Sequence, residues 1–355
     1  MDETRRQFLD DLLDTASPSG YEVPGQRVWV EYVSEFAKEV RTDEYGNAVA
    51  VHEGDPDSEV EIALAGHGDE IGFIVREVTD DGFLTIGRVG GSDKTVTRGQ
   101  HVTVHADDGP VPGVVGQTAI HLRDGDDEAP PDIEKQRVDI GAEDEETAAQ
   151  LVEVGDPVTF TQEVHELADG RLTARGMDNR IGIWAAAEGL RRAVEAGGDA
   201  TVYAVSTVQE EVGLQGARMV GFDLDPDAVI AADVTHATDS PDVPSGKSTG
   251  VELGGGPVVA RGSANHPALV AAVRDVASEA DLDVQLQATG SRTGTDADAF
   301  YTARGGTPSL NVGLPNRYMH TPVEVIDEHD LEALADLLGA VGARAETYAP
   351  FGVDL

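Results

Sequence analysis

The stretch Ser206-Thr207-Val208-Gln209-Glu210-Glu211-Val212-Gly213 places two adjacent carboxylates directly after a predicted strand. Residues 200–205 form a short run that is rich in β-branched and aromatic side chains, and this run follows a Gly-Gly-Asp turn. The pattern predicts a buried strand. A buried parallel strand normally delivers its functional groups at its carboxyl end. Because adjacent side chains leave the backbone in different directions, one of Glu210 and Glu211 can bind a metal while the other takes a proton from water. The alternative is an acidic surface turn.

The net charge of the chain is strongly negative and indicates the conditions in which the protein works. The 355 residues include 67 Asp and Glu against 25 Lys and Arg, a net charge of −42, and the acid is dispersed along the chain. Self-repulsion of this size destabilises a compact fold at low salt, whereas at molar salt the Debye length falls to about 3 Å. We therefore interpret the charge as an adaptation to high salt, typical of a halophile. An acidic surface for a basic partner is the alternative.

What the sequence lacks excludes several functions. No cysteine is present, so disulfides, thiolate catalysis and Cys-based zinc sites are ruled out. So acidic a chain offers little to neutralise phosphates, and nucleic acid is not expected as a partner. No apolar run approaches the ~20 residues that span a bilayer, and Arg5-Arg6 is followed by acidic residues rather than by the apolar stretch of an export signal. We expect no membrane association and a cytoplasmic location.

Hydrophobic periodicity predicts an α/β chain with an insertion. Helical spacing of apolar residues is found over residues 3–15, 24–39, 178–193, 265–280 and 327–345. Strand-like runs alternate with these helices at 60–65, 200–205, 228–232, 283–287 and 309–312. We expect a doubly wound, mostly parallel sheet flanked by helices, formed by residues 1–71 and 162–355. Residues 72–161 instead show short β-type runs between Gly, Asp and Pro turns, which predicts an inserted β-rich domain.

Acids and histidines occur where such a sheet would gather them. They follow or end predicted strands, or open a predicted helix: His67, Asp69, Asp178, Glu210, Glu211, Asp233 and His320. Because the carboxyl ends of parallel strands share one edge, we expect these side chains to meet there. Two imidazoles and three carboxylates suit a pair of divalent ions of the Zn, Co or Mn kind. Each residue alone has an ordinary alternative, such as a helix N-cap for Asp178.

Seven stretches along the chain resemble the tetrahedral (TET) aminopeptidase family, which also contains glutamyl aminopeptidases and proteins named endoglucanases. They occur in the family's order and with its rough spacing: Ser17–Glu22, Gly66–Gly72, Met177–Arg180, Gln209–Gly213, Asp233–His236, Gly294–Ala297 and Arg317–Pro322. The resemblance therefore runs from one end of the chain to the other. Combined with the acidity, it suggests a halophilic archaeon as the source.

The resemblance implies a centre of two divalent ions, Zn, Co or Mn, and assigns protein ligands to each ion. Asp178 bridges the two ions. His67 and Asp233 complete one site, and Glu211 and His320 complete the other. A hydroxide that bridges the metals attacks the peptide carbonyl.

The resemblance also implies the remaining roles. Glu210 is the general base that passes the proton to the leaving amine. Asp69 holds the His67 imidazole in one tautomer. Thr295 and Asp296 are expected beside the substrate pocket, and Arg292, close to them in the sequence, is one feature that would favour acidic substrates. Side-chain preference otherwise stays open.

The activity implied is that of a dimetal aminopeptidase that removes N-terminal residues from short peptides. The β-rich insertion resembles the family's dimerisation domain, and the family's dimers assemble into hollow tetrahedral dodecamers. Gly68, Met177 and Gln215 depart from the family's usual residues, but none of them is an expected ligand or base. The alternatives are a glycan hydrolase of the endoglucanase type, which needs two carboxylates and no metal, and a non-catalytic metal-binding assembly protein.

The interpretation of the charge predicts a salt-dependent stability. We expect the melting temperature to rise between about 0.1 M and 1 M KCl, because the Debye length falls from ~10 Å to ~3 Å over this range. Thermal unfolding followed by circular dichroism would measure it, with sucrose of equal osmolarity as the control. A melting temperature that is indifferent to KCl would contradict the interpretation and favour an acidic binding surface.

Overall fold

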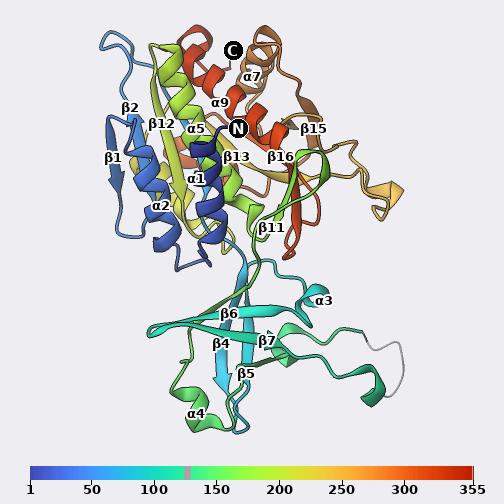
Figure 1. Ribbon diagram of the computed structural model, residues 1–355. Coiled ribbons are helices and arrows are strands. Elements are labelled where there is room, and N and C mark those ends of the chain that lie inside the picture. The colour runs from blue at the N-terminus through green and yellow to red at the C-terminus, as the bar shows by residue number, and fades with distance from the viewer. Residues whose placement is uncertain (124–128, 354) are drawn as a thin grey trace.

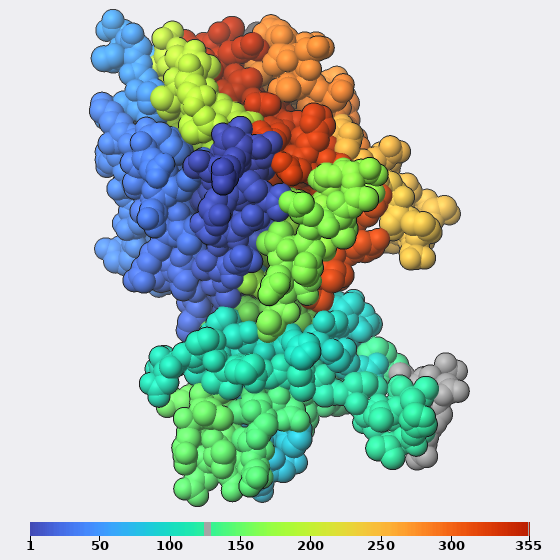
Figure 2. Space-filling model, in the orientation of Figure 1, coloured from blue at the N-terminus to red at the C-terminus, as the bar shows by residue number. Residues whose placement is uncertain are grey.

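The computed structural model describes residues 1–123, 129–353 and 355. Figure 1 shows an α/β body that holds both termini and a β-barrel that projects from one end of it. In the space-filling view of Figure 2, the barrel forms a separate lobe below the body.

The body is built on an eight-stranded sheet. In spatial order its strands are β1 (Glu39–Thr42), β2 (Ala48–His52), β12 (Thr201–Thr207), β3 (Glu61–His67), β13 (Ala228–His236), β16 (Ser309–Asn316), β14 (Val258–Gly262) and β15 (Gln285–Thr289). The central strands β12, β3, β13 and β16 are parallel, whereas β2 pairs antiparallel with β12, and β14 with β16. The predicted mostly parallel sheet is confirmed, and its four central strands end at a common edge.

Helices cover both faces of this sheet. One face packs against α1 (Glu3–Asp14), α2 (Val23–Val33), α5 (Met177–Ala196), α7 (Pro267–Glu279) and α9 (Glu328–Tyr348), and the other against α6 (Gln215–Asp223) and α8 (Ala297–Phe300). Along β12, Val202 and Ala204 point into the first core, whereas Tyr203 and Val205 point into the second. A strand buried on both faces reads as a continuous apolar run for this reason. Within the described residues, no helix combines the length and apolarity needed to cross a membrane.

Some predicted boundaries are wrong. The helix expected over 24–39 ends at Val33, because residues 39–42 pair with β2 as an edge strand. The strands expected to end at residues 232 and 312 continue to His236 and Asn316, because residues 233–236 of β13 pair with residues 313–316 of β16. Asp233 therefore lies within β13 rather than at its end. Pairing between distant segments decided these differences.

The inserted segment forms a closed six-stranded barrel. Its strands, in order around the barrel, are β4 (Gly72–Val78), β5 (Leu84–Val89), β8 (Arg137–Asp139), β7 (Gly109–Val115), β6 (His101–Ala106) and β9 (Pro157–Phe160). Two short helices, α3 (Lys94–Thr97) and α4 (Glu145–Ala149), lie between strands. The barrel has its own apolar core, in which Phe73 and Phe160 meet edge to face at 5.3 Å between ring centroids. A β-rich insertion is thus present, while the domain boundaries at residues 72 and 161 stay a prediction.

A small antiparallel sheet carries the chain from the barrel back into the body. It consists of β10 (His165–Glu166), β11 (Arg171–Ala174) and β17 (Glu324–Asp327). Short 3-10 segments occupy Ile120–Leu122, Ile133–Lys135, Ala168–Gly170, Ser245–Lys247 and Ala303–Gly305.

A buried ion cluster holds the junction between body and barrel. Glu70 lies where the chain leaves β3 for the barrel, and Arg175 lies where it returns; the guanidinium Nη1 donates to both Glu70 carboxylate oxygens at 2.6 Å. Arg180 Nη2 donates to Glu70 Oε1 at 2.8 Å, and its Nη1 donates to the Gly68 carbonyl at 2.9 Å. All three charged side chains are buried. The cluster therefore fixes the loop after β3 against the first turns of α5.

We predict that Glu70→Gln lowers the free energy of unfolding by about 3–5 kcal/mol, because it leaves two buried guanidinium groups without their carboxylate. Denaturant unfolding would measure the change. Glu166→Gln is the matched control, since it removes the same charge from an exposed pair with Arg6, which is worth about 0–1 kcal/mol.

The same variant has a predictable pH dependence. Burial works to raise the pKa of Glu70, but Arg175 and Arg180 outweigh it and hold the pKa below its ordinary value. The carboxylate therefore stabilises the fold above the unfolded pKa of about 4.3. As the pH falls from there through the lower folded pKa, the difference between wild type and Glu70→Gln should shrink. A difference that grows on acidification would contradict this account.

Candidate active site

The predicted site residues come together at the carboxyl edge of the central strands. His67 ends β3, the Glu-Glu pair follows β12, and His320 follows β16. The cavity at this edge has a volume of about 270 Å³, and its lining includes His67, Asp178, Glu210, Glu211, Asp233 and His320. Topology thus gathers residues that are up to 253 positions apart in the sequence (from 67 to 320).

Asp178 lies between the two imidazoles. Its Oδ1 is 3.2 Å from His67 Nε2, and its Oδ2 is 3.3 Å from His320 Nε2. Asp233 Oδ1 lies 3.8 Å from His67 Nε2, and Glu211 Oε1 lies 3.7 Å from His320 Nε2. The N-cap of α5 is Gly176, and Asp178 has non-helical dihedral angles. Its side chain is therefore turned to the cavity rather than used to cap the helix.

Two groups of donor atoms are close enough to hold a cation. His67, Asp178 and Glu211 form one group, and His67, Glu210 and Asp233 form the other, with the donor atoms of each group within 4.8 Å of one another. These groups differ in part from the ligand sets that the resemblance implies. Glu210, expected as a base, lies among the donors, and His320 belongs to neither group.

The cavity gathers four carboxyl groups, and among the described residues that line it only imidazoles can carry a positive charge against them. No Lys or Arg occurs among the described residues that line it. Burial raises the pKa of Glu210 to about 10 and those of Glu211 and Asp233 to about 8. Burial opposes ionisation of Asp178 as well, but hydrogen bonds with His320 and His67 hold its pKa below its ordinary value. Crowded carboxylate oxygens and imidazole nitrogens, with no Lys or Arg to balance the acids, fit a divalent cation.

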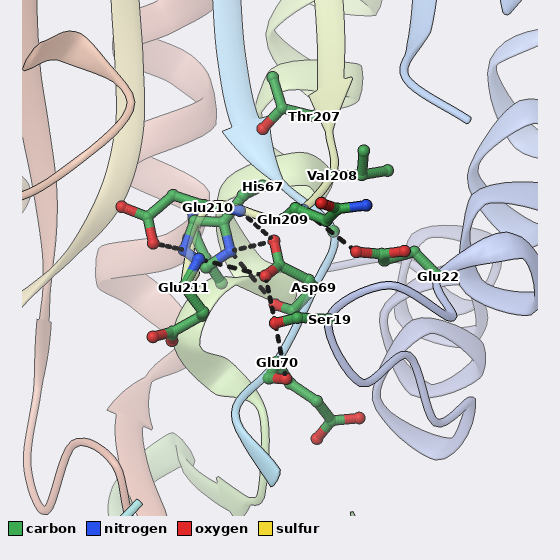
Figure 3. A network of polar contacts seen from close by, with 12 residues as sticks. Ser19, Glu22, His67, Asp69, Glu70, Thr207, Val208, Gln209, Glu210 and Glu211 are labelled. Atoms are coloured by element: carbon green, nitrogen blue, oxygen red, sulfur yellow. Dashed lines mark hydrogen bonds and ion pairs between the residues drawn. The ribbon is translucent and has the colours of Figure 1, made fainter. Parts of the chain in front are cut away.

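Asp69 holds several residues of this cluster in place through hydrogen bonds. It is fully buried, and its carboxylate accepts hydrogen bonds from the backbone N–H groups of Glu210 at 2.9 Å and Glu211 at 3.2 Å. The Ser19 hydroxyl donates to it at 2.6 Å, and Figure 3 draws this contact beside the Glu-Glu pair. His67 Nδ1 lies 3.3 Å from Asp69 Oδ1 and 3.2 Å from its backbone carbonyl oxygen. With Nδ1 facing these acceptors, Nε2 is the nitrogen that faces the cavity.

Glu324 is a site residue that the sequence analysis missed. Its buried carboxylate accepts from the backbone N–H groups of Asp178 at 3.1 Å and His320 at 2.9 Å. It therefore holds two cavity residues from different segments in place, and burial raises its pKa to about 8. The available signal was an acid at the start of the apolar run Val325-Ile326, four residues after His320.

The two predicted substrate residues lie in different environments. Thr295 lines the cavity together with Thr293 and Gly294. Asp296 does not line it: the side chain is buried, its Oδ2 accepts from the Thr207 hydroxyl at 2.5 Å, and its Oδ1 has no partner among the described residues. Arg292 is exposed and does not line the cavity either.

A mostly parallel sheet with carboxylates and imidazoles at its carboxyl edge is the arrangement of a metal-dependent enzyme. The family described as M42 glutamyl aminopeptidase matches residues 46–337. The chain is 32% identical over 339 residues to the lysyl aminopeptidase of Pyrococcus furiosus, which covers 94% of this chain and 96% of that relative. The chain therefore belongs to the M42 aminopeptidase family and is a metallo-aminopeptidase.

Solved structures agree with this assignment over the whole chain. An aminopeptidase from the archaeon Desulfurococcus kamchatkensis superimposes with a TM-score of 0.91 at 31% identity, covering 99% of this chain and 100% of that one. The TET1 peptidase of Pyrococcus horikoshii, which can assemble into a tetrahedron or a large octahedral shell, gives 0.85 at 30% identity and covers 95% and 99%. The predicted family is confirmed, and the halophilic source stays a prediction.

Proposed function

We propose that the cavity removes the N-terminal residue of short peptides with two divalent cations bound. The position of Asp178 between two imidazoles carries this proposal, because a carboxylate with one oxygen toward each ring can serve two ions. His67 and Asp233 would hold one ion, and Glu211 and His320 the other. Zn and Co suit these donors, with Mn as a third candidate.

The chemistry divides between the ions and the protein. When bound, such ions polarise the peptide carbonyl and lower the pKa of the attacking water. Glu210 takes the proton from that water and returns it to the leaving amine, so that one C–N bond is broken and one water is consumed. Burial keeps the pKa of Glu210 high, and neighbouring positive charge brings it toward the neutral range in which a base works best. Asp69 fixes the positions of the Glu210 backbone and the His67 ring through the contacts described above.

The cavity suits a short occupant. Its volume of about 270 Å³ lies below the range of about 300–1,000 Å³ that is usual for ligand pockets. A cavity of this size supports a small occupant, such as the terminal residue of a peptide.

We also propose that the chain forms dimers through its barrel and that these assemble into a tetrahedral dodecamer. Large apolar side chains are exposed on or beside the barrel strands: Val114, Ile120, Leu122, Leu151 and Val154. Exposed apolar surface of this kind marks interaction sites. The shells of the TET1 relative support the same assembly.

The other functions considered find less support. A glycan hydrolase works with a pair of carboxylates and no metal, and the imidazoles of His67 and His320 amid the acids have no part in that mechanism. A non-catalytic metal binder would use Glu210 at most as one of the donors and would have no need of a base. Chelator-resistant release of sugar, or bound metal without hydrolysis of any peptide, would favour these alternatives in turn.

We predict that Glu210→Gln lowers kcat on aminoacyl reporters by about 10²–10⁴-fold, because the general base is lost, while the metal content stays that of wild type. Steady-state kinetics in molar salt and elemental analysis would measure the two quantities. Glu59→Gln, at an exposed position, is the matched control. Unchanged turnover would contradict the role of Glu210, and loss of metal would place it among the ligands instead.

The cavity wall predicts the preferred side chain. Outside the six residues of the acid–imidazole cluster, the described lining residues include no Lys, Arg, Asp or Glu: Val234, Thr235, His236, Thr293, Gly294, Thr295 and Met319. An acidic side chain would be buried there with no Lys or Arg as a partner, which is costly. We expect reporters with N-terminal Leu, Met or Ala to be cleaved at least about tenfold faster, in kcat/KM, than those with Glu, a difference of about 1.4 kcal/mol. Faster cleavage of the Glu reporter would contradict this.

A further inference from the structure

The inserted barrel contacts the proposed metal centre directly. The chain leaves β5 at Val89 and continues through Gly90 and Gly91. The Gly91 carbonyl oxygen lies 3.2 Å from His320 Nδ1. A backbone group of the barrel thereby accepts the proton of an imidazole that belongs to the body.

This turn has no room for side chains. A Cβ on Gly91 would lie 2.4 Å from His320 Nδ1 and 2.5 Å from its Cε1. A Cβ on Gly90 would lie 3.3 Å from Glu211 Oε2 and 2.7 Å from a methyl group of Ile71, and Gly90 has a φ of +68°. Contacts below 3 Å require a neighbour to move, so two glycines let the turn approach both His320 and Glu211.

The turn is anchored rather than free. The Ser92 hydroxyl is buried and donates to the Gly72 carbonyl at 3.0 Å. Asp93 caps α3 by accepting from the Thr95 N–H at 2.8 Å. These bonds tie the residues after the turn to the barrel, so the Gly91 carbonyl has a defined direction.

His320 is held from two sides. Its backbone N–H donates to Glu324 of the body, and its ring Nδ1 faces Gly91 of the barrel. When Nδ1 carries the proton and donates it in a hydrogen bond to the Gly91 carbonyl, the lone pair of Nε2 points toward Asp178 and Glu211. Partners of this kind fix both the tautomer and the orientation of a metal-binding imidazole.

We propose that the Gly90-Gly91 turn is a positioning element of the metal centre, which sets the tautomer and rotamer of His320 through the Gly91 carbonyl. The inference rests on the proposed function, because it assigns His320 to a cation. It makes one ligand of the centre depend on a group from the inserted barrel.

The first test compares Gly91→Ala with Gly116→Ala. Gly116 belongs to the same barrel, and a Cβ there meets only the Arg137 carbonyl at 3.8 Å. Each protein is loaded with Co²⁺, dialysed against graded chelator, and analysed for metal per subunit and for the visible absorption of bound Co²⁺. We expect Gly91→Ala to bind one of the two ions about 10–100-fold more weakly than wild type and to recover turnover in excess Co²⁺, while Gly116→Ala behaves as wild type.

The second test asks whether the effect passes through His320. His320→Ala and the double variant Gly91→Ala/His320→Ala should bind metal equally, because the glycine has nothing to position once the imidazole is absent. The double variant also removes the side chain that the new Cβ would meet. If Gly91→Ala alone fails to fold, the double variant should fold, and failure of both would show that the turn serves the fold instead.

The outcomes distinguish a failure of this inference from a failure of the proposed two-metal function. Wild-type metal affinity in Gly91→Ala, with peptide hydrolysis intact in wild type, would overturn the inference and leave the aminopeptidase site standing. A wild-type protein that binds no Co²⁺ would instead overturn the proposed two-metal function.

Discussion

A cluster of buried carboxyl groups at one sheet edge, with no Lys or Arg against it, is the constraint on which the rest of the site depends. Three residues after His67, the buried carboxylate of Glu70 is balanced by two arginines, and its pKa is lowered. Glu210 and Asp233 are buried with the His67 imidazole 3.8 Å away from each and no arginine against them, and their pKa values are raised. The fold thus neutralises its structural acid internally and leaves the acids of the cavity for an external cation. Perturbed carboxylates of this second kind are the ones that mark functional sites.

Holding like charges together requires a framework of hydrogen bonds, and it comes from every part of the chain. Asp69 receives the backbone N–H groups of the Glu-Glu pair, and Glu324 receives those of Asp178 and His320. The barrel adds the Gly91 carbonyl. No one of these segments can place the donors alone. Their mutual hydrogen bonds hold the donors together as one set, as a metal centre needs.

Particular residues show which features of the site could be predicted from patterns in the sequence. The buried strand before Ser206 was predictable because a strand covered on both faces must be apolar throughout, and the ligand candidates followed from placing acids at strand ends. Glu324 was missed because a single acid beside an apolar run carries no mark of its partners. Asp296 was expected beside the substrate pocket; its side chain is buried and bonded to Thr207 and does not line the cavity, since spacing along the chain does not give the direction of a side chain.

The sequence by itself determined the α/β class, the mostly parallel sheet with its β-rich insertion, and the M42 aminopeptidase family, because these follow from local periodicity and from motifs that can be read in order. The tertiary structure alone decided where strands β13 and β16 end, that the insertion closes into a barrel, and that its Gly90-Gly91 turn meets His320. These features arise from pairing and contact between segments far apart in the chain. Such contacts depend on how elements pack in three dimensions, which no local pattern of residues encodes.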